Sequence, residues 1–305
     1  MRRKIALVLV AVVAAVSLVG CSDNKEPLNN SSESQISENN NSSTSLASSS
    51  GTSEESNSSK PETVVPEVTF TQEDFENSKK WLTITPSDNF VVGCSVEATK
   101  VVIPDHVVGI GELAFKGLNT LKAVIIPKSV TEIGSMAFCE CTGLTSINIP
   151  DRVTKIEQGT FQYCRSLTSI KIPDRVTKIS TRAFSDCTGL TSINIPNRVT
   201  EIGEQAFAGC TGLTSVTIPN KVTTISTGTF SDCIGLISVT IPDSVTTIYF
   251  NAFKDCIGLT SVTIPDSVTK ISENAFEGCE NISVTYKGKT YDYAHIEELY
   301  EAANG

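Results

Sequence analysis

The ten residues CTGLTSINIP occupy Cys141–Pro150 and return unchanged at Cys187–Pro196. A near-copy, CRSLTSIKIP, lies midway between them at Cys164–Pro173. The three stretches are therefore 23 residues apart (164 − 141 = 23), and one unit of that length repeats. A fixed period between about 20 and 50 residues is typical of repeat architectures, in which each unit packs mainly on its two neighbours.

Three residue types mark the repeat, and each returns at the same step of 23 residues. The prolines are Pro104, Pro127, Pro150, Pro173, Pro196, Pro219, Pro242 and Pro265; the phenylalanines are Phe115, Phe138, Phe161, Phe184, Phe207, Phe230, Phe253 and Phe276; the cysteines are Cys141, Cys164, Cys187, Cys210, Cys233, Cys256 and Cys279. Leu118 replaces the cysteine in the first unit, which indicates that this position serves apolar packing.

One unit, Leu190–Cys210, illustrates the expected local structure. Ile193 and Ile195 alternate with polar residues, and this period of two predicts a strand with one buried face. Pro196 ends that strand because proline has no N–H to donate to a ladder. The apolar residues of Ala206–Cys210 have helical spacing, so we expect a short helical turn before the chain returns to the next strand.

A single unit cannot bury its apolar side chains, whereas stacked units bury them against one another. At about 1.5–3 kcal/mol for each large side chain, an inner unit gains on the order of 10 kcal/mol before conformational entropy is subtracted. The sequence therefore predicts an α/β fold: a solenoid of about eight 23-residue coils over residues 99–281.

The columns Leu-x-x-Ile-x-Ile-Pro, Val-x-x-Ile and Ala-Phe-x-x-Cys resemble the BspA-like class of bacterial leucine-rich repeats. The resemblance covers residues 99–281, and it implies a right-handed solenoid with roles in adhesion or protein binding and no catalytic activity. The chain departs from many leucine-rich repeats in lacking their buried asparagine ladder. The corresponding column is Ser129, Arg152, Arg175, Arg198, Lys221, Ser244 and Ser267.

Both ends of a solenoid require covers, because the terminal coils otherwise expose their apolar sides. Residues 67–98 are expected to form the N-terminal cap, with a hairpin built from Trp81–Ile84 and Phe90–Val92. Residues 282–305 are expected to form the C-terminal cap. There Ile282–Tyr291 predicts strand, turn and strand, and Tyr293–Ala303 predicts a helix.

Residues 1–20 have the layout of an export signal, with a basic start followed by an apolar run too short to span a membrane. The run ends at Cys21 and turns polar at once, which resembles the bacterial lipobox. The resemblance implies that Cys21 is lipidated and anchors an exported protein to the bacterial membrane, facing the cell exterior. The alternative is an ordinary signal peptide with an incidental cysteine. Residues 21–66, rich in Ser, Asn and Glu, predict a disordered tether.

Composition argues against several functions. The formal net charge is −10, which makes nucleic acid an unfavourable partner. The two histidines, His106 and His295, fall near opposite ends of the repeat, so they cannot join one catalytic or metal-binding cluster. The sequence thus predicts no enzyme, no cofactor and no metal site, and it leaves the oligomeric state open.

The cysteine column allows two interpretations. Adjacent coils bring their Cα atoms to about 5 Å, inside the range for disulfides, and export permits oxidation. Alternatively, the thiols are a reduced, buried ladder of small apolar side chains. Cys139 and Cys94 lie off the column, so we expect them to be the more exposed thiols.

One section of the solenoid is basic within an acidic chain. Residues 141–200 hold eight basic and four acidic residues, a net charge of +4 (8 − 4). We expect a basic ridge that binds an acidic macromolecule of the host or the cell envelope; its residues are Arg152, Lys155, Lys171, Arg175, Lys178, Arg198 and Lys221. One alternative is solvated charge balanced by Asp151 and Asp174. Another is an envelope spacer without a specific ligand.

Overall fold

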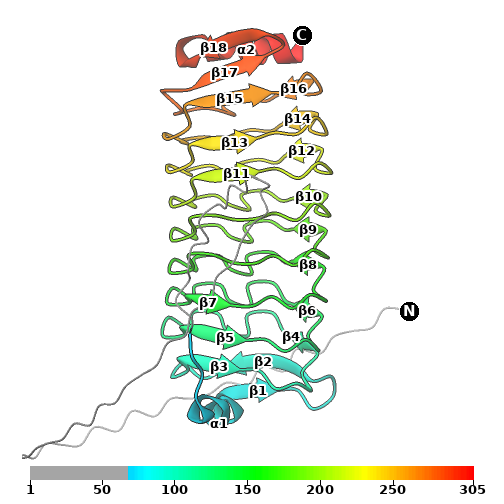
Figure 1. Ribbon diagram of the computed structural model, residues 1–305, viewed down its shortest axis with the longest axis vertical. Coiled ribbons are helices and arrows are strands. Elements are labelled where there is room, and N and C mark those ends of the chain that lie inside the picture. The colour runs from blue at the N-terminus through cyan, green and yellow to red at the C-terminus, as the bar shows by residue number, and fades with distance from the viewer. Residues whose placement is uncertain (1–67) are drawn as a thin grey trace, which may run out of the picture. The chain divides into compact units, whose positions relative to one another are not determined.

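The computed structural model describes residues 68–305, where the 23-residue units stack as coils in a column (Figure 1). This is the solenoid expected from the sequence. The predicted signal peptide, Cys21 and the predicted tether lie outside the described residues.

The first side of most coils carries a strand of two to four residues, which pairs in parallel with that of a neighbouring coil. The register advances by one unit per coil, as in Ser215 opposite Ser238 and Val216 opposite Val239. In the middle coils this ladder shrinks to a single bridge between Lys171 and Asn194. The long strands are β3 Lys100–Val102, β5 Ala123–Ile125, β7 Ser146–Ile147, β11 Ser215–Thr217, β13 Ser238–Thr240, β15 Ser261–Ile264 and β17 Ser283–Tyr286.

The second side carries a two-residue strand in every coil, again in parallel register. Its second residue is isoleucine throughout, and each of these isoleucines is buried. The short strands are β4 Gly109–Ile110, β6 Glu132–Ile133, β8 Lys155–Ile156, β9 Lys178–Ile179, β10 Glu201–Ile202, β12 Thr224–Ile225, β14 Thr247–Ile248 and β16 Lys270–Ile271.

The third side differs from the expected helical turn, since it consists of successive tight turns. In each coil the residues two before and two after the phenylalanine have positive φ, as do Arg182 (55°) and Asp186 (59°) around Phe184. Alternate N–H groups therefore point in opposite directions. Those of Phe184 and Asp186 bond the next coil at 2.8 and 2.7 Å, whereas that of Ser185 bonds Arg182 within the coil. An α-helix would satisfy its own amides and leave neighbouring coils unbonded on this side.

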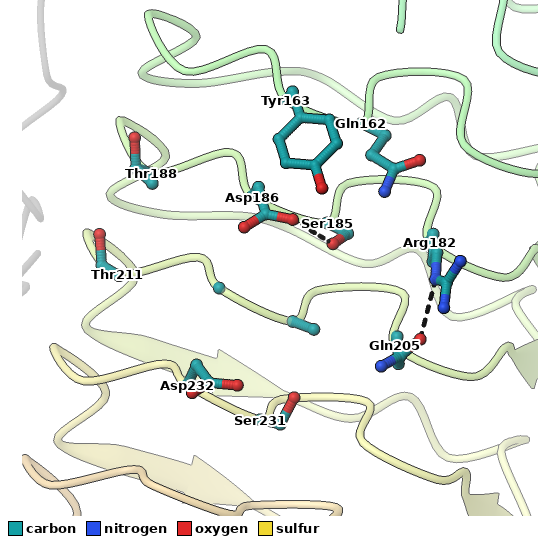
Figure 2. Close-up of a pocket in the computed structure, with 12 residues that line it drawn as sticks. Gln162, Tyr163, Arg182, Ser185, Asp186, Thr188, Gln205, Thr211, Ser231 and Asp232 are labelled. Atoms are coloured by element: carbon teal, nitrogen blue, oxygen red, sulfur yellow. Dashed lines mark hydrogen bonds between the residues drawn. The ribbon is translucent and has the colours of Figure 1, made fainter. Parts of the chain in front are cut away.

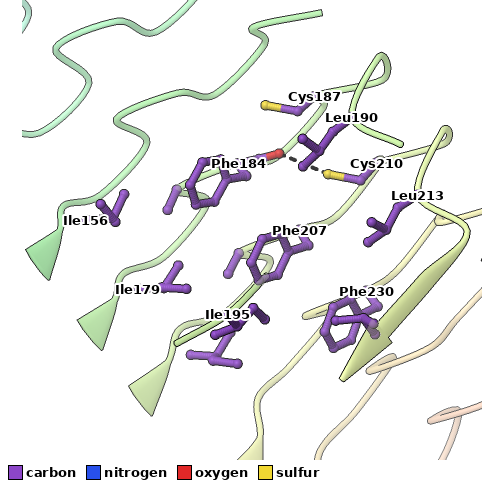
Figure 3. Packing of buried hydrophobic residues seen from close by; sticks show 14 of the residues in the cluster. Ile156, Ile179, Phe184, Cys187, Leu190, Ile195, Phe207, Cys210, Leu213 and Phe230 are labelled. Atoms are coloured by element: carbon purple, nitrogen blue, oxygen red, sulfur yellow. Dashed lines mark hydrogen bonds between the residues drawn. The ribbon is translucent and has the colours of Figure 1, made fainter. Parts of the chain in front are cut away.

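The core is a column of stacked side chains (Figure 3). All eight repeat phenylalanines are fully buried, and successive ring centroids lie 4.8 to 5.7 Å apart with nearly parallel planes. Buried leucine and isoleucine columns surround the rings. Leu118 is buried in the cysteine column, which confirms the packing role of that position.

The N-terminal cap contains the expected hairpin, formed by β1 Leu82–Ile84 and β2 Phe90–Cys94 in antiparallel register. An additional helix, α1 Gln72–Trp81, precedes it and was not predicted. Thr71 and Asp74 form a capping box that starts this helix. Its buried Ser78 accepts the N–H of Val102 at 2.8 Å, so α1 satisfies part of the exposed edge of the first coil.

The C-terminal cap supplies hydrogen-bond acceptors that a further coil would otherwise provide. β17 pairs with β18 Lys289–Asp292, and η1 Tyr293–His295 then leads into α2 Ile296–Asn304, as expected. The hydroxyls of Tyr300 and Tyr293 each accept a backbone N–H, from Phe276 and Gly278 respectively, both at 3.1 Å. In inner coils the equivalent N–H groups bond the next coil's carbonyls. The two tyrosines thus terminate the ladder.

Truncating one core ring tests whether the phenylalanine column maintains the stack. Phe207→Ala removes a fully buried side chain between two stacked rings, so we expect a loss of about 3–5 kcal/mol in the free energy of unfolding. Phe250→Ala is the matched control because Phe250 is 50% exposed, and it should change stability by less than about 0.5 kcal/mol. Urea unfolding followed by circular dichroism measures both, and equal effects would contradict the assignment.

Candidate binding surface

The basic ridge lies at the corner between the long and short strands. Each repeat proline begins a tight turn whose fourth residue donates its N–H back to the proline carbonyl, for example Val176 to Pro173 at 3.0 Å. The third residue of that turn projects outward, and in four consecutive coils it is basic. These residues are Arg152, Arg175, Arg198 and Lys221, all exposed.

In three other coils the residue at this position is a serine that forms a hydrogen bond to the preceding coil. Ser129, Ser244 and Ser267 each donate a hydroxyl to a valine carbonyl of the preceding coil, at 2.6, 2.7 and 2.8 Å. The four basic residues between them make no such bond. The serines thus provide part of the ladder whose asparagines are missing, and the ridge interrupts it. The basic residues also stand about 5 Å apart along the column, and neighbouring like charges are destabilising.

Most residues of the ridge make no direct ion pair with another described residue. Within residues 68–305, Lys178 is the only ridge residue in an ion pair, with Glu201 at 2.7 Å between Nζ and Oε1. Asp151 and Asp174 are exposed beside the arginines, but no ion pair joins them to the ridge in this part of the chain. If these two carboxylates balance the ridge, as the alternative interpretation holds, they do so through solvent and not through direct contacts.

The remaining ridge lysines extend the charge onto both neighbouring sides. Lys155 and Lys178 lie opposite each other in the register of β8 and β9, and Lys171 is exposed on the long-strand side. A hollow of about 300 Å³ adjoins Lys155 and Lys178. Ser180 lines it, and its buried hydroxyl has no hydrogen-bond partner within the protein. The structure thus brings the predicted ridge together at one corner, with polar groups beside it.

A second hollow, of about 530 Å³, lies on the side of tight turns and was not anticipated (Figure 2). Tyr163 and Asp186 occupy one positive-φ column there, where other coils have residues such as Gly209. Arg182 Nε donates to Gln205 Oε1 at 2.8 Å, and Ser185 Oγ donates to Asp186 Oδ2 at 2.7 Å. In the sequence, Tyr163 is the one aromatic residue in a column of small or acidic residues. This departure is the signal that could have identified the hollow.

The cysteine column is buried and reduced. All nine cysteines of the described region are free. Each column thiol donates to the carbonyl of a phenylalanine in the preceding coil, such as Cys210 to Phe184 at 3.2 Å (Figure 3). Burial raises the pKa of the Cys141 and Cys233 thiols to about 12. The expectation for Cys139 was wrong, since it is buried, whereas Cys94 is partly exposed.

The described residues assemble no recognisable catalytic group. His295 pairs with Asp292 at 2.6 Å on the surface of the C-terminal cap, and this contact raises the pKa of the imidazole. His106 is exposed near the other end of the solenoid. Over residues 68–305 no cluster of three or more His, Cys, Asp or Glu side chains has the arrangement of a metal site. In the same region no helix is both long and apolar enough to cross a membrane.

Comparison with known families agrees with the stacked coils. The model of the BspA type leucine rich repeat region matches in six copies, over residues 83–214 and 154–283. The chain belongs to the BspA-type leucine-rich repeat family. Proteins with this repeat are generally non-enzymatic scaffolds, and membership points to a protein-binding or surface role.

Solved structures support this assignment. The leucine-rich repeat protein of T. pallidum is 30% identical with a TM-score of 0.53, over 62% of this chain and 90% of that one. A leucine-rich repeat protein from Bacteroides ovatus is also 30% identical, with a TM-score of 0.58, over 67% of this chain and 62% of its own length. No curated protein matches the chain.

The buried thiols make stability depend on alkaline pH. A thiol in the unfolded chain has a pKa of about 8.5. Because Cys233 ionises only near pH 12 in the folded state, the folded protein retains its proton and stability falls as pH rises from about 8.5 to 12. Cys233→Ala should reduce this decline by about 1.4 kcal/mol per pH unit near pH 10, measured by urea unfolding at several pH values. An unchanged slope would show that the native thiol is already accessible to ionisation.

Proposed function

We propose that this protein is exported, anchored to the bacterial membrane through lipid on Cys21, and binds an acidic macromolecule of the host or the cell envelope through the basic ridge without chemistry. The signal-like residues 1–20 and the position of Cys21 support the anchoring. Family membership supports the surface-binding role. Adhesion to a surface that carries the acidic partner is the expected outcome.

One observation supports the ridge most strongly. At its central column, Arg152, Arg175, Arg198 and Lys221 replace serines that hydrogen-bond adjacent coils elsewhere. A hydrogen bond of this kind contributes about 0.5–1.5 kcal/mol, and stacking like charges weakens the fold further. Packing therefore does not explain why four consecutive coils carry cations. A ligand with complementary negative charge does explain it.

Restoring serine separates binding from folding. Arg175→Ser with Arg198→Ser should weaken binding to an acidic probe, poly-glutamate or polyphosphate, at least about tenfold, because two charge-assisted contacts are lost. Stability should stay equal or increase, since serine at this column makes the bond seen at Ser244. Titration calorimetry and urea unfolding of the Cys21→Ser protein, with and without these changes, measure the two quantities.

The matched control is Lys80→Ser with Lys270→Ser, which removes the same charge from exposed positions outside the ridge. It should leave probe binding nearly unchanged. If both double variants lost the same binding affinity, the effect would come from the protein's net charge and not from the ridge. No saturable binding of either probe would favour a spacer without a specific ligand.

Lipid anchoring has its own test. Cys21→Ser removes the only thiol at the end of the apolar run and should move the protein from the membrane fraction to the soluble fraction. Incorporation of labelled palmitate should disappear with it. The control, Ser22→Ala, should retain both properties. A Cys21→Ser protein that stays with the membrane would contradict the anchor.

A further inference from the structure

Three isoleucines lie exposed on coils close to the C-terminal end. Ile234, Ile237 and Ile257 have exposed fractions of 48, 58 and 55%. We call them the isoleucine patch. They follow the cysteine column, at the corner where the tight turns lead into the long strands, and none of them belongs to the basic ridge.

Two of the three residues are direct neighbours between coils, and the third follows closely in the chain. Ile234 and Ile257 occupy the same position in successive coils, and the N–H of Gly258 donates to the carbonyl of Ile234 at 3.1 Å. Ile237 lies three residues after Ile234, around a corner formed at Gly235. Contiguous exposed apolar groups of this kind mark interaction sites more often than isolated ones do.

The fold itself does not require isoleucine here. The position of Ile234 and Ile257 is threonine in the two preceding coils, at Thr188 and Thr211, which also line the hollow of Figure 2. The position of Ile237 is threonine in the four preceding coils, at Thr145, Thr168, Thr191 and Thr214. Thr191 and Thr214 each donate a hydroxyl to a carbonyl of the preceding coil at 3.4 Å. Isoleucine at position 237 cannot form this bond, and its apolar side chain is exposed. Having isoleucine there instead of threonine therefore does not stabilise the stack.

The charges around the isoleucine patch are negative. Glu280 occupies the position of Ile257 in the next coil and is exposed. Asp232 and Asp255 lie two residues before Ile234 and Ile257; Asp232 is exposed and Asp255 is half-buried. The nearby cation, Lys254, is held by Glu277, with 3.1 Å between Nζ and Oε1. An apolar centre with acidic surroundings complements aliphatic groups flanked by basic ones.

We propose that the isoleucine patch docks a protein segment whose aliphatic side chains are flanked by lysine or arginine. An anionic membrane is disfavoured because its charge has the same sign as Asp232 and Glu280. The chain's own residues 22–66 lack this chemistry, since they hold two lysines against seven acidic residues. The isoleucine patch favours a basic partner and the basic ridge an acidic one. An experiment can therefore reject either proposal without rejecting the other.

The test uses the Cys21→Ser protein and a synthetic peptide of alternating leucine and lysine. We expect saturable binding that Ile234→Thr, Ile237→Thr and Ile257→Thr together weaken at least about tenfold, because half-exposed isoleucines lose apolar contact area. Threonine occupies these positions in several other coils, so the variant should fold, and urea unfolding checks that it does.

The controls separate apolar contact from charge. Tyr249→Ser with Phe250→Thr removes exposed aromatic side chains at the other end of the tight turns and should leave binding unchanged. Peptides that alternate leucine with glutamate, or serine with lysine, should bind at least tenfold more weakly. Unchanged binding by the triple variant, or equal binding of the leucine–glutamate peptide, overturns the proposal. The proposal is also overturned if sedimentation shows that the protein self-associates and that only the triple variant does not. The patch would then bind a second copy of the chain.

Discussion

The structure depends on the match between the length of each coil and that of its neighbours. A period of 23 residues places every buried side chain above its counterpart, so that rings such as Phe184 and Phe207 stack at 5.4 Å with nearly parallel planes. The same register aligns the backbone, and each side of a coil then bonds the coils above and below. A single inserted residue would displace both the rings and the amides, which explains why the columns are so strict.

Because packing fixes the inward columns, departures from the repeat at outward positions are informative. Serine and threonine are the residues that reinforce the stack, through hydroxyls that reach the preceding coil. Arginine at Arg175 and isoleucine at Ile237 abandon that role and place charge or apolar surface in water. Two corners of one solenoid thus carry opposite chemistry, basic at one and apolar with acidic surroundings at the other. A rigid repeat can present both without changing its core.

The ends of the stack show how a repeat is closed. The hydroxyls of Tyr300 and Tyr293 take the place of carbonyls from a coil that does not follow. At the other end the hydroxyl of Ser78 in α1 accepts an N–H from the first long strand. In both cases side chains satisfy backbone groups that stacking satisfies elsewhere. The thiols act differently, since each adds a weak bond to a phenylalanine carbonyl within the buried core.

The sequence by itself determined the period, the first strand of the unit, the buried columns and the hairpins of both caps, because regular spacing of apolar residues reflects stacking directly. The short second strand was decided by the tertiary structure, since only pairing with neighbouring coils makes two residues a strand. It also located the basic ridge, whose residues share one column. Only the tertiary structure decided that the segment around Phe184 is a series of turns: its amides bond the next coil, and apolar spacing cannot distinguish that from a helical turn. The absence of ion pairs between Asp174 and the arginines and the burial of Cys139 were likewise decided there. Both depend on the directions of side chains between neighbouring coils, which a linear pattern does not contain.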